Sequence, residues 1–393
     1  MKVYLDHSAT TPVDTEVAKV MYESMLDNWG NPSSVHGFGR EARKALELAR
    51  EKIAHSIGAE PMEIFFTSGG TEADNWAIKG IAESNEKKGK HIITSAIEHH
   101  AVMDACKYMA KRGWQITFVP VDEYGMVNVD DVAKAITNET VLISIMHANN
   151  EVGTIQPVEE IGKLAKEKGI YFHVDAVQTV GKIPVDVKDL NCDLLSIAAH
   201  KIYGPKGIGC LYIRKGTRIT PFIHGGAQER KRRAGTENIP GIIGFGRAIE
   251  KAVANRDEVA KKEVALRDKI IKFVNENIPD IKLNGHSEKR LPNNVNFSFR
   301  YIEGESLLLS LDMRGIGASS GSACTSGSLD PSHVLLAMGL THEVAHGSLR
   351  LTLGKDNNEE EIDYLLQVLP EIVDRLRAMS PLYAKEKGVL HNV

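Results

Sequence analysis

The sequence predicts an α/β protein, in which a large domain has a mainly parallel sheet covered by helices and a smaller domain is α+β. Short β-branched or aromatic runs alternate with amphipathic stretches, which is typical of βαβ crossovers and therefore of parallel strands. From residue 239 this alternation gives way to a long helical stretch. The length of 393 residues is enough for two or three domains.

The large domain is expected to contain seven short strands, each flanked by turn residues. They are predicted at 64–67, 91–94, 115–119, 141–145, 171–175, 194–197 and 208–213. Helical patterns lie between them, for example at 72–81, 101–111 and 158–168. Strict alternation of strands and helices predicts right-handed crossovers that cover both faces of the sheet.

The second part of the chain has a different pattern. A helical stretch is predicted at 239–277, a strand at 295–299, a helix at 304–313, a Gly/Ser-rich loop at 318–329, a helix from Pro331, a strand at 348–353 and a final helix at 359–377. We expect a large domain at 14–255, and a smaller domain at 1–13 and 256–393 that packs against the first helices of the chain.

Composition excludes several classes of protein. The chain is 42% hydrophobic and 25% charged, as in ordinary globular proteins, and its formal charge of −4 predicts no general affinity for nucleic acid. It contains no apolar run long enough for a membrane helix and no signal peptide at its start. The four cysteines are too scattered for a disulfide framework or zinc knuckles. We therefore expect a cytoplasmic protein without an intrinsic metal site.

Two segments place polar groups at strand ends. In 66–72 a strand leads through Ser68, Gly69 and Gly70 into a helix with Thr71 near its start, where unpaired N–H groups can bind an anion. Taken alone, this segment is more often an ordinary helix start. Asp175 ends the strand 171–175 at the edge where α/β sheets place their ligands. A structural Asp that caps the next turn is equally compatible with that segment.

Lys201 follows the strand 194–197 among small residues. A lysine held away from water loses its charge more readily, and its free amine can form a Schiff base. A surface lysine is the simpler interpretation of Lys201 alone. Together with an anion site and a strand-end carboxylate, however, Lys201 supplies the three contacts of pyridoxal phosphate: the phosphate, the pyridinium nitrogen and the aldehyde.

Cys324 lies in a run of Gly, Ser and Ala at 318–328, unlike Cys210 in its apolar strand. A cysteine in such a polar loop can reach a ligand, which makes Cys324 a candidate nucleophile. Downstream, Arg350 lies in the strand 348–353 and is suited to a bidentate hold on a carboxylate. A structural salt bridge is the alternative for Arg350.

With these residues the chain resembles the pyridoxal-phosphate-dependent cysteine desulfurases of the NifS/IscS type, in the class V aminotransferase group. The resemblance runs nearly end to end and rests on nine motifs in one order. They are at 4–11, 30–34, 67–72, 98–99, 149–153, 173–178, 200–201, 233–236 and 320–326. The Ser-Ala-Cys-Thr core of the last motif resembles group I of the family.

The resemblance implies fold type I of the pyridoxal phosphate enzymes and a role for each matching residue. Lys201 would carry the cofactor as a Schiff base, and His99 would stack on its ring and transfer protons. The resemblance also implies that Asp175 contacts the ring nitrogen and that Gln178 contacts the ring hydroxyl. The implied phosphate contacts are Gly70, Thr71, His200 and a partner subunit's Thr236. Asn150 is a further implied cofactor contact. The substrate amino acid would be held by Asn31, Asn150 and Arg350, and Cys324 would take the sulfur.

The resemblance also implies partners. These are L-cysteine, a second copy of the chain and a sulfur acceptor such as an iron–sulfur scaffold protein, with Cys324 able to ligate a cluster transiently. Nitrogenase maturation and tRNA thiolation are alternative destinations for the sulfur. One departure concerns Ala198, where family members usually have a Ser that binds the phosphate. Losing that hydrogen bond costs about 0.5–1.5 kcal/mol of cofactor binding.

Three functions from different classes follow from these residues. The first is sulfur transfer from L-cysteine by a sulfurtransferase. The second is another reaction on the same fold, either transamination or selenocysteine lysis, and a transaminase would have no use for Cys324. The third is a scaffold without activity, which has no need of all four of Lys201, Asp175, His99 and Cys324. Absorbance of bound cofactor separates both enzyme hypotheses from the scaffold.

Overall fold

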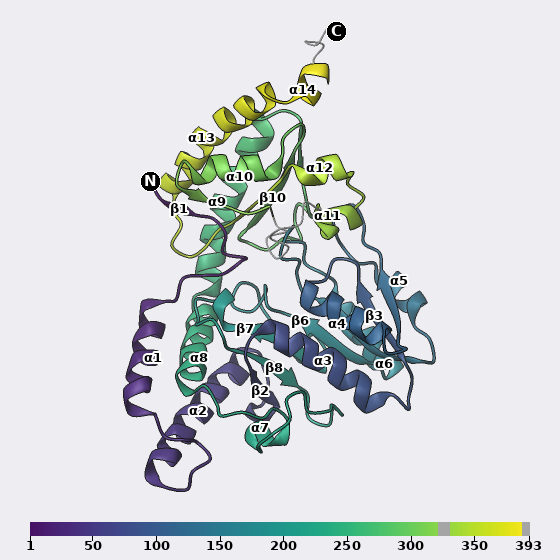
Figure 1. Ribbon diagram of the computed structural model, residues 1–393, viewed down its shortest axis with the longest axis vertical. Helices are drawn as coiled ribbons and strands as arrows, with labels where there is room; N and C mark the ends of the chain where they lie inside the picture. Colours follow the sequence, from purple (N-terminus) through teal and green to yellow (C-terminus); the bar gives the residue numbers. More distant parts are fainter. Residues whose placement is uncertain (321–330, 387–393) are drawn as a thin grey trace.

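The computed structural model describes residues 1–320 and 331–386. The predicted nucleophile Cys324 and most of its Gly/Ser-rich loop lie outside the described residues. Figure 1 shows an elongated molecule with a large sheet at one end and a smaller unit at the other.

The large sheet has seven strands in the order β2-β8-β7-β6-β5-β3-β4. Their bounds are β2 Ile64–Thr67, β3 His91–Ser95, β4 Gln115–Val119, β5 Thr140–Met146, β6 Tyr171–Asp175, β7 Leu194–Ala198 and β8 Gly209–Ile213. The predicted strands and the mainly parallel sheet are thus confirmed, except that β8 runs antiparallel to both β2 and β7. A parallel partner needs a long crossover, and the connection from β7 to β8 holds only a short 3-10 turn, Ala199–Lys201.

Successive strand residues face opposite sides of the sheet, and each side has its own core. On one side Phe65, Ile92 and Leu194 pack with the helices α3 Gly70–Asn85 and α4 His100–Ala110. On the other side Phe66, Ile93 and Leu195 pack with residues of α2 Gly37–Ser56, α5 Val129–Ala135, α6 Val158–Lys168 and α8 Ile239–Ala254.

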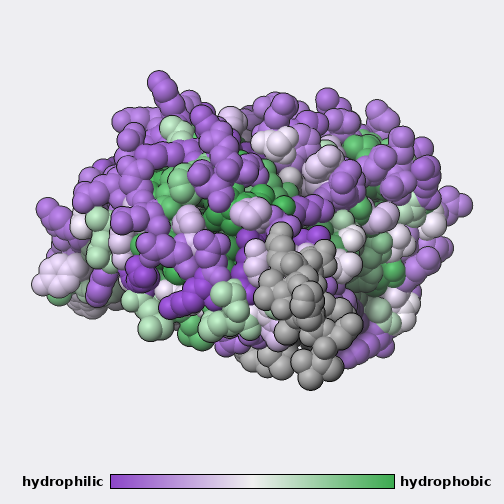
Figure 2. All heavy atoms as spheres, turned by 90° about the horizontal axis from the view of Figure 1, so that it is seen from above, coloured by the Kyte–Doolittle hydropathy of each residue, from purple (hydrophilic) through white to green (hydrophobic). Residues whose placement is uncertain are grey.

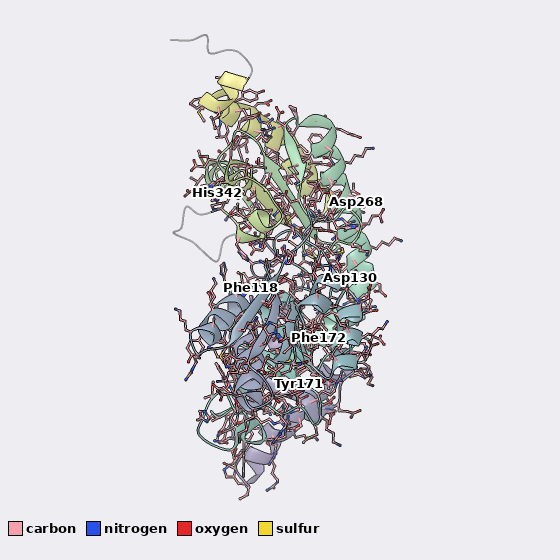
Figure 3. All side chains as sticks on the ribbon, turned by 90° about the vertical axis from the view of Figure 1, so that its right-hand side faces the viewer. Phe118, Asp130, Tyr171, Phe172, Asp268 and His342 are labelled. Carbon is pink, nitrogen blue, oxygen red and sulfur yellow. The ribbon has the colours of Figure 1, made fainter. Side chains whose placement is uncertain are left out.

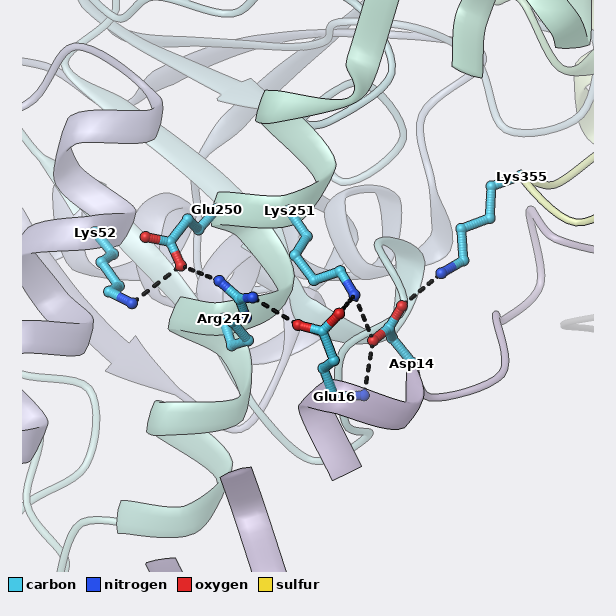
Figure 4. Close-up of polar contacts among 7 residues, drawn as sticks. All are labelled: Asp14, Glu16, Lys52, Arg247, Glu250, Lys251 and Lys355. Atoms are coloured by element: carbon cyan, nitrogen blue, oxygen red, sulfur yellow. Dashed lines mark hydrogen bonds and ion pairs between the residues drawn. The ribbon is translucent and has the colours of Figure 1, made fainter. Parts of the chain in front are cut away.

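The helix α1 Thr15–Asp27 and α2 lie against α8, so the expectation that the smaller domain packs on the first helices is wrong. Charged residues reinforce this contact: Arg247 pairs with Glu16 at 2.6 Å, and Lys251 pairs with Glu16 at 2.9 Å (Figure 4). The predicted helical stretch 239–277 is also two helices, because it breaks at Asn255 between α8 and α9 Arg256–Asn277.

The smaller unit is built on a three-stranded antiparallel sheet, with β10 Asn294–Phe299 between β9 Ile281–Leu283 and β12 Ser348–Thr352. Its core contains residues of α9, α10 Gly304–Asp312 and α13 Glu359–Ala378. The first strand, β1 Val3–Tyr4, pairs with β11 Ile316–Gly317, so the N-terminus lies with this unit (Figure 1). We propose that the two cores mark two domains, 14–255 and 1–13 with 256–393.

Short helices complete the smaller unit. The helix expected from Pro331 begins at His333 as α11 His333–Ala337, α12 His342–His346 follows, and α13 is succeeded by α14 Pro381–Glu386 rather than being the final helix. In Figure 3, Asp268 of α9 and His342 of α12 lie on opposite sides of this unit.

The face of the molecule seen in Figure 2 is mostly hydrophilic. In residues 1–320 and 331–386, no helix combines the length and apolar character needed to span a bilayer.

Candidate active site

The predicted site residues gather where three strands end at one edge of the large sheet. Asp175 ends β6, β7 leads into the turn that carries Lys201, and β2 ends at Thr67 before α3. These three strands run in the same direction. The carboxyl ends of parallel strands are where α/β sheets bind their ligands, and the predicted grouping of Lys201 with Asp175 follows from this arrangement.

The anion-binding turn, residues 68–71, is shaped by two glycines. Gly69 has φ +154° and is the N-cap of α3, so no side chain caps the first N–H groups of the helix. A Cβ on Gly70 would lie 2.9 Å from Val177 Cγ2 and 3.6 Å from Ala198 Cβ. A side chain at position 70 would crowd Val177, and in the described residues no side chain caps the first N–H groups of α3, which are therefore suited to an anion. Ala198 therefore adjoins the turn.

The N-terminal segment supplies acceptors for Lys201. The Lys201 ammonium donates to the carbonyl oxygen of Ala9 at 2.8 Å and to that of Ser8. Gln178 Nε2 donates to the same Ser8 oxygen at 3.0 Å, and Gln178 Oε1 accepts from Lys182 Nζ at 3.3 Å. Ser8 thus brings the side chains of Lys201 and Gln178 to one point.

Asp175 is a buried carboxylate, only 6% exposed. Burial raises its pKa to about 6, although the Val177 N–H at 3.0 Å and the Lys201 ammonium favour the charged form. Asp175 in turn raises the pKa values of two further buried acids. Burial raises the pKa of Glu98 to about 8, and burial with repulsion from Asp175 raises the pKa of Asp74 well above its usual value. At neutral pH, Asp175 is therefore charged more readily than Glu98.

Two histidines flank Lys201. His99 is the N-cap of α4, and its Nδ1 accepts from Ala101 N at 3.1 Å. Burial, and then the Lys201 ammonium, lower the pKa of His99 to about 4, so its ring is neutral at pH 7. Burial and the same ammonium lower the pKa of His200 to about 4, and its Nδ1 lies 3.1 Å from Thr10 Oγ1.

Arg350 is 2% exposed and lies in β12. Its Nη2 donates to Asp6 Oδ1 at 2.7 Å and its Nη1 donates to the Asn150 carbonyl at 3.0 Å, while Nε is buried and has no partner among residues 1–320 and 331–386. The structure therefore brings Arg350 beside Asn150 and also shows the structural salt bridge that was its alternative. Backbone hydrogen bonds join Arg350 to Ser319, at the base of the loop that continues to Cys324.

Thr236 and Asn31 lie apart from these residues within one chain. Thr236 is exposed in the segment that follows α7 Gln228–Lys231. Asn31 is exposed between α1 and α2, where its Oδ1 accepts from Ser33 N at 2.9 Å. In the described residues, neither side chain hydrogen-bonds to the site around Lys201.

The three described cysteines are buried in the large domain. Burial raises the pKa of Cys106 to about 12, and it also raises the pKa values of Cys192 and Cys210. A thiol with so high a pKa forms little thiolate and is a poor nucleophile. The three fit the packing roles that their apolar surroundings predict.

Sequence reasoning missed several residues of the site. Asp6 contacts Arg350, and Ser8 and Ala9 contact Lys201, but local patterns assign no role to them or to Asp74. The motif at 4–11 is the available signal. Its function could not be inferred, because Asp6 and Arg350 are 344 residues apart.

The model of the family described as aminotransferase class-V matches residues 3–365. The chain belongs to the class V aminotransferases. It is 59% identical to cysteine desulfurase IscS from Methanosarcina thermophila, over 99% of this chain and 96% of that protein. It is 58% identical to the protein of the same name from Clostridium botulinum, with 97% of each covered.

A solved NifS-like protein superposes with a TM-score of 0.90 at 45% identity, with 96% of this chain and 100% of that chain covered. A structure described as SspA in complex with cysteine matches with a TM-score of 0.80 at 38% identity, over 90% of this chain and 99% of that chain. Within its family the chain is thus a member of the IscS/NifS type of cysteine desulfurases, which have fold type I and depend on pyridoxal phosphate. The resemblance expected from the motifs is confirmed.

The residues at the strand ends fit this cofactor. A helix start that, in the described residues, has no side-chain cap suits its phosphate, and Asp175, whose pKa burial raises, suits its ring nitrogen. The amine of Lys201 lies near Asp175 and His99, since its charge lowers the pKa values of both. In the described part of the chain, no group of three His, Cys, Asp or Glu side chains could hold a metal ion.

Proposed function

We propose that this chain converts L-cysteine to L-alanine and passes the sulfur, as a persulfide on Cys324, to an acceptor. The observation that carries the proposal is the convergence of Lys201, Asp175 and the anion-binding turn at one sheet edge, beside Arg350. Arg350 pairs through its backbone with Ser319, and Cys324 follows Ser319 by five residues. The loop therefore begins next to the proposed substrate site.

Each residue has a proposed role toward the cofactor. Lys201 binds its aldehyde, Asp175 neutralises the ring nitrogen, and Gln178 donates to the ring hydroxyl. The phosphate lies on Gly70 and Thr71 with His200. When bound, pyridoxal phosphate withdraws electrons from the carbon atoms of the substrate. Asp175 supports this withdrawal, because its negative charge stabilises a protonated ring nitrogen.

The remaining residues act on the substrate. Arg350 binds the carboxylate of L-cysteine with Asn150, and we propose Asn31 as a further substrate contact, supplied between subunits because it is remote within one chain. The Cys324 thiolate attacks the substrate sulfur, so that the carbon–sulfur bond breaks and a sulfur–sulfur bond forms. The electron pair left on carbon takes a proton, for which neutral His99 is the carrier, and L-alanine results.

We also propose a homodimer whose subunits share their sites. Thr236 is exposed, as a donor to a partner's phosphate must be. The region from α1 to the start of α2 exposes large apolar side chains, a pattern typical of contact surfaces: Tyr22 at 64%, Met25 at 57%, Leu26 at 58%, Trp29 at 64%, Val35 at 89% and Phe38 at 54%. A second copy of the chain would cover these side chains.

The acceptor proposed first is an iron–sulfur scaffold protein in the cytoplasm, with Cys324 as a transient cluster ligand. Nitrogenase maturation and tRNA thiolation remain as alternatives. The deciding experiment incubates the purified protein with L-cysteine and pyridoxal phosphate, measures alanine and sulfide, and maps the persulfide by mass spectrometry. Alanine formed in a ratio of one per sulfur, with the extra sulfur on Cys324, is expected. Transamination without sulfide release would contradict the proposal.

A further inference from the structure

Glu72, in the first turn of α3, joins two segments that are far apart in the sequence. Its Oε2 accepts from Ser68 N, in the anion-binding turn, at 2.8 Å. Arg233 reaches both oxygens of the same carboxylate, Nε to Oε1 at 2.8 Å and Nη2 to Oε2 at 3.1 Å. A bidentate pair fixes the relative orientation of both side chains. The turn and the segment around Arg233 are therefore held together through one carboxylate.

A second tie fixes the start of that segment. Glu229 is 5% exposed, pairs with the buried Arg50 at 2.8 Å and accepts from Phe66 N, just before the turn, at 2.8 Å. Glu229, Arg230 and Lys231 all have left-handed φ values, 45°, 57° and 65°. Side-chain-bearing residues keep this conformation only where the surroundings hold it. Residues 229–236 are thus built onto the end of β2 at two points.

The charges of Glu72 and Arg233 affect how well the turn binds a phosphate. Glu72 places a carboxylate within one helical turn of the N–H groups that would hold a phosphate, and two anions so close repel each other. Arg233 offsets that repulsion. Burial alone would raise the pKa of Glu72, but the hydrogen bonds from Arg233 and Ser68 outweigh burial and lower it. Phosphate binding therefore favours the state in which Arg233 is paired with Glu72.

We propose that Glu72 is a positioning residue which locks the anion-binding turn to the segment carrying Thr236, so that cofactor bound at one site of the homodimer favours binding at the other. This inference rests on the proposed function, because it requires Thr236 to contact the partner's phosphate. Cofactor at one site orders the turn, Glu72 and Arg233 transmit that order to Thr236 of the same chain, and Thr236 completes the second site. Coupling of this kind is reciprocal.

The test measures cofactor binding rather than turnover. In a Lys201→Ala background, where no covalent bond masks the affinity, the dimer is titrated with pyridoxal phosphate at equilibrium. We expect a Hill coefficient above 1. Glu72→Gln, which keeps an acceptor for Ser68 but loses the ion pair, and Arg233→Met should each bring the coefficient to 1 and weaken binding at least about fivefold. The double variant should be no weaker than the weaker single variant, because the pair acts as a unit.

Arg247→Met is the matched control, since Arg247 also pairs with a glutamate, Glu16, but lies between α8 and α1 (Figure 4). It should keep the parent's coefficient. Arg233→Lys, which keeps the charge without the bidentate geometry, replaces Arg233→Met if the latter does not fold. A parent dimer that binds cofactor with a coefficient of 1, or variants that keep the parent's coefficient, would overturn the inference alone. An unsubstituted protein that is monomeric or binds no pyridoxal phosphate would overturn the proposed function as well.

Discussion

Arg350 donates to the carboxylate of Asp6 at 2.7 Å, although the two residues are 344 positions apart. The pair brings the N-terminal segment and β12 together at the proposed substrate site. The Asn150 carbonyl accepts from a second guanidinium nitrogen, and Nε is buried with no partner in the described part of the chain. A buried donor without a partner carries a desolvation cost that a substrate carboxylate would relieve.

Arg350→Lys should therefore weaken L-cysteine binding. The lysine keeps the charge, but its single ammonium cannot reproduce the geometry by which the guanidinium hydrogen-bonds to Asp6, Asn150 and a substrate carboxylate at once. We expect KM for L-cysteine to rise by about ten- to a hundredfold, or about 1.4–2.8 kcal/mol, with a smaller fall in kcat. Arg314→Lys, at an exposed pair with Glu371, is the control. An unchanged KM with a lower melting temperature would make Arg350 purely structural.

Lys201 should be the residue that binds the cofactor covalently. Borohydride reduction followed by peptide mapping is expected to find the cofactor on Lys201, and Lys201→Ala should purify without covalently bound cofactor. Lys206, five residues later, is the internal comparison. A reduced adduct on Lys206 would contradict the assignment.

Cys324→Ser should retain the cofactor absorbance and bind L-cysteine, but form neither persulfide nor alanine. The hydroxyl is a poor nucleophile toward sulfur, and the three buried cysteines ionise too weakly to replace the thiol. Cys106→Ser serves as the control and should remain active. Turnover by Cys324→Ser, with a persulfide on Cys106, Cys192 or Cys210, would refute the proposed mechanism.

Ala198→Ser should strengthen phosphate binding, because Ala198 Cβ lies 3.6 Å from the Cβ position of Gly70 in the anion-binding turn. The added hydroxyl should be worth about 0.5–1.5 kcal/mol, or about two- to twelvefold slower cofactor dissociation. Dissociation is measured in the Lys201→Ala background. An unchanged rate would show that another group already supplies this hydrogen bond.

Glu98 should make the protein less stable as the pH rises. Its folded pKa of about 8 lies above its usual value of 4.5 because of burial. Between these values the folded state binds more protons than the unfolded state, so the free energy of unfolding falls with rising pH. Glu98→Gln stays neutral and should lose less stability than the parent between pH 5 and about 8.5 in urea denaturation. Parallel stability profiles for the two proteins would argue against a protonated Glu98 at neutral pH.

Local patterns predicted much of this fold, because each strand of the large sheet is a short apolar run between turn residues. They also located Asp175 and Lys201, whose chemistry depends on the ends of those strands. The direction of β8 was not predictable in this way, since it depends on the length of its connection to β7. The roles of Asp6, Ser8 and Glu72 depend on partners distant in sequence, and no local pattern identifies such partners.

The pairing of β2 with β8 bears on the order in which the protein can fold during synthesis. In the large sheet β2 has one neighbour, and that neighbour is about 145 residues nearer the C-terminus. The turn at the end of β2 therefore cannot pack against the large sheet until β8, residues 209–213, has left the ribosome. Domains fold during synthesis as the segments that they contain emerge. Nascent chains that are arrested on the ribosome before β8 has emerged should fail to bind pyridoxal phosphate, even after long incubation.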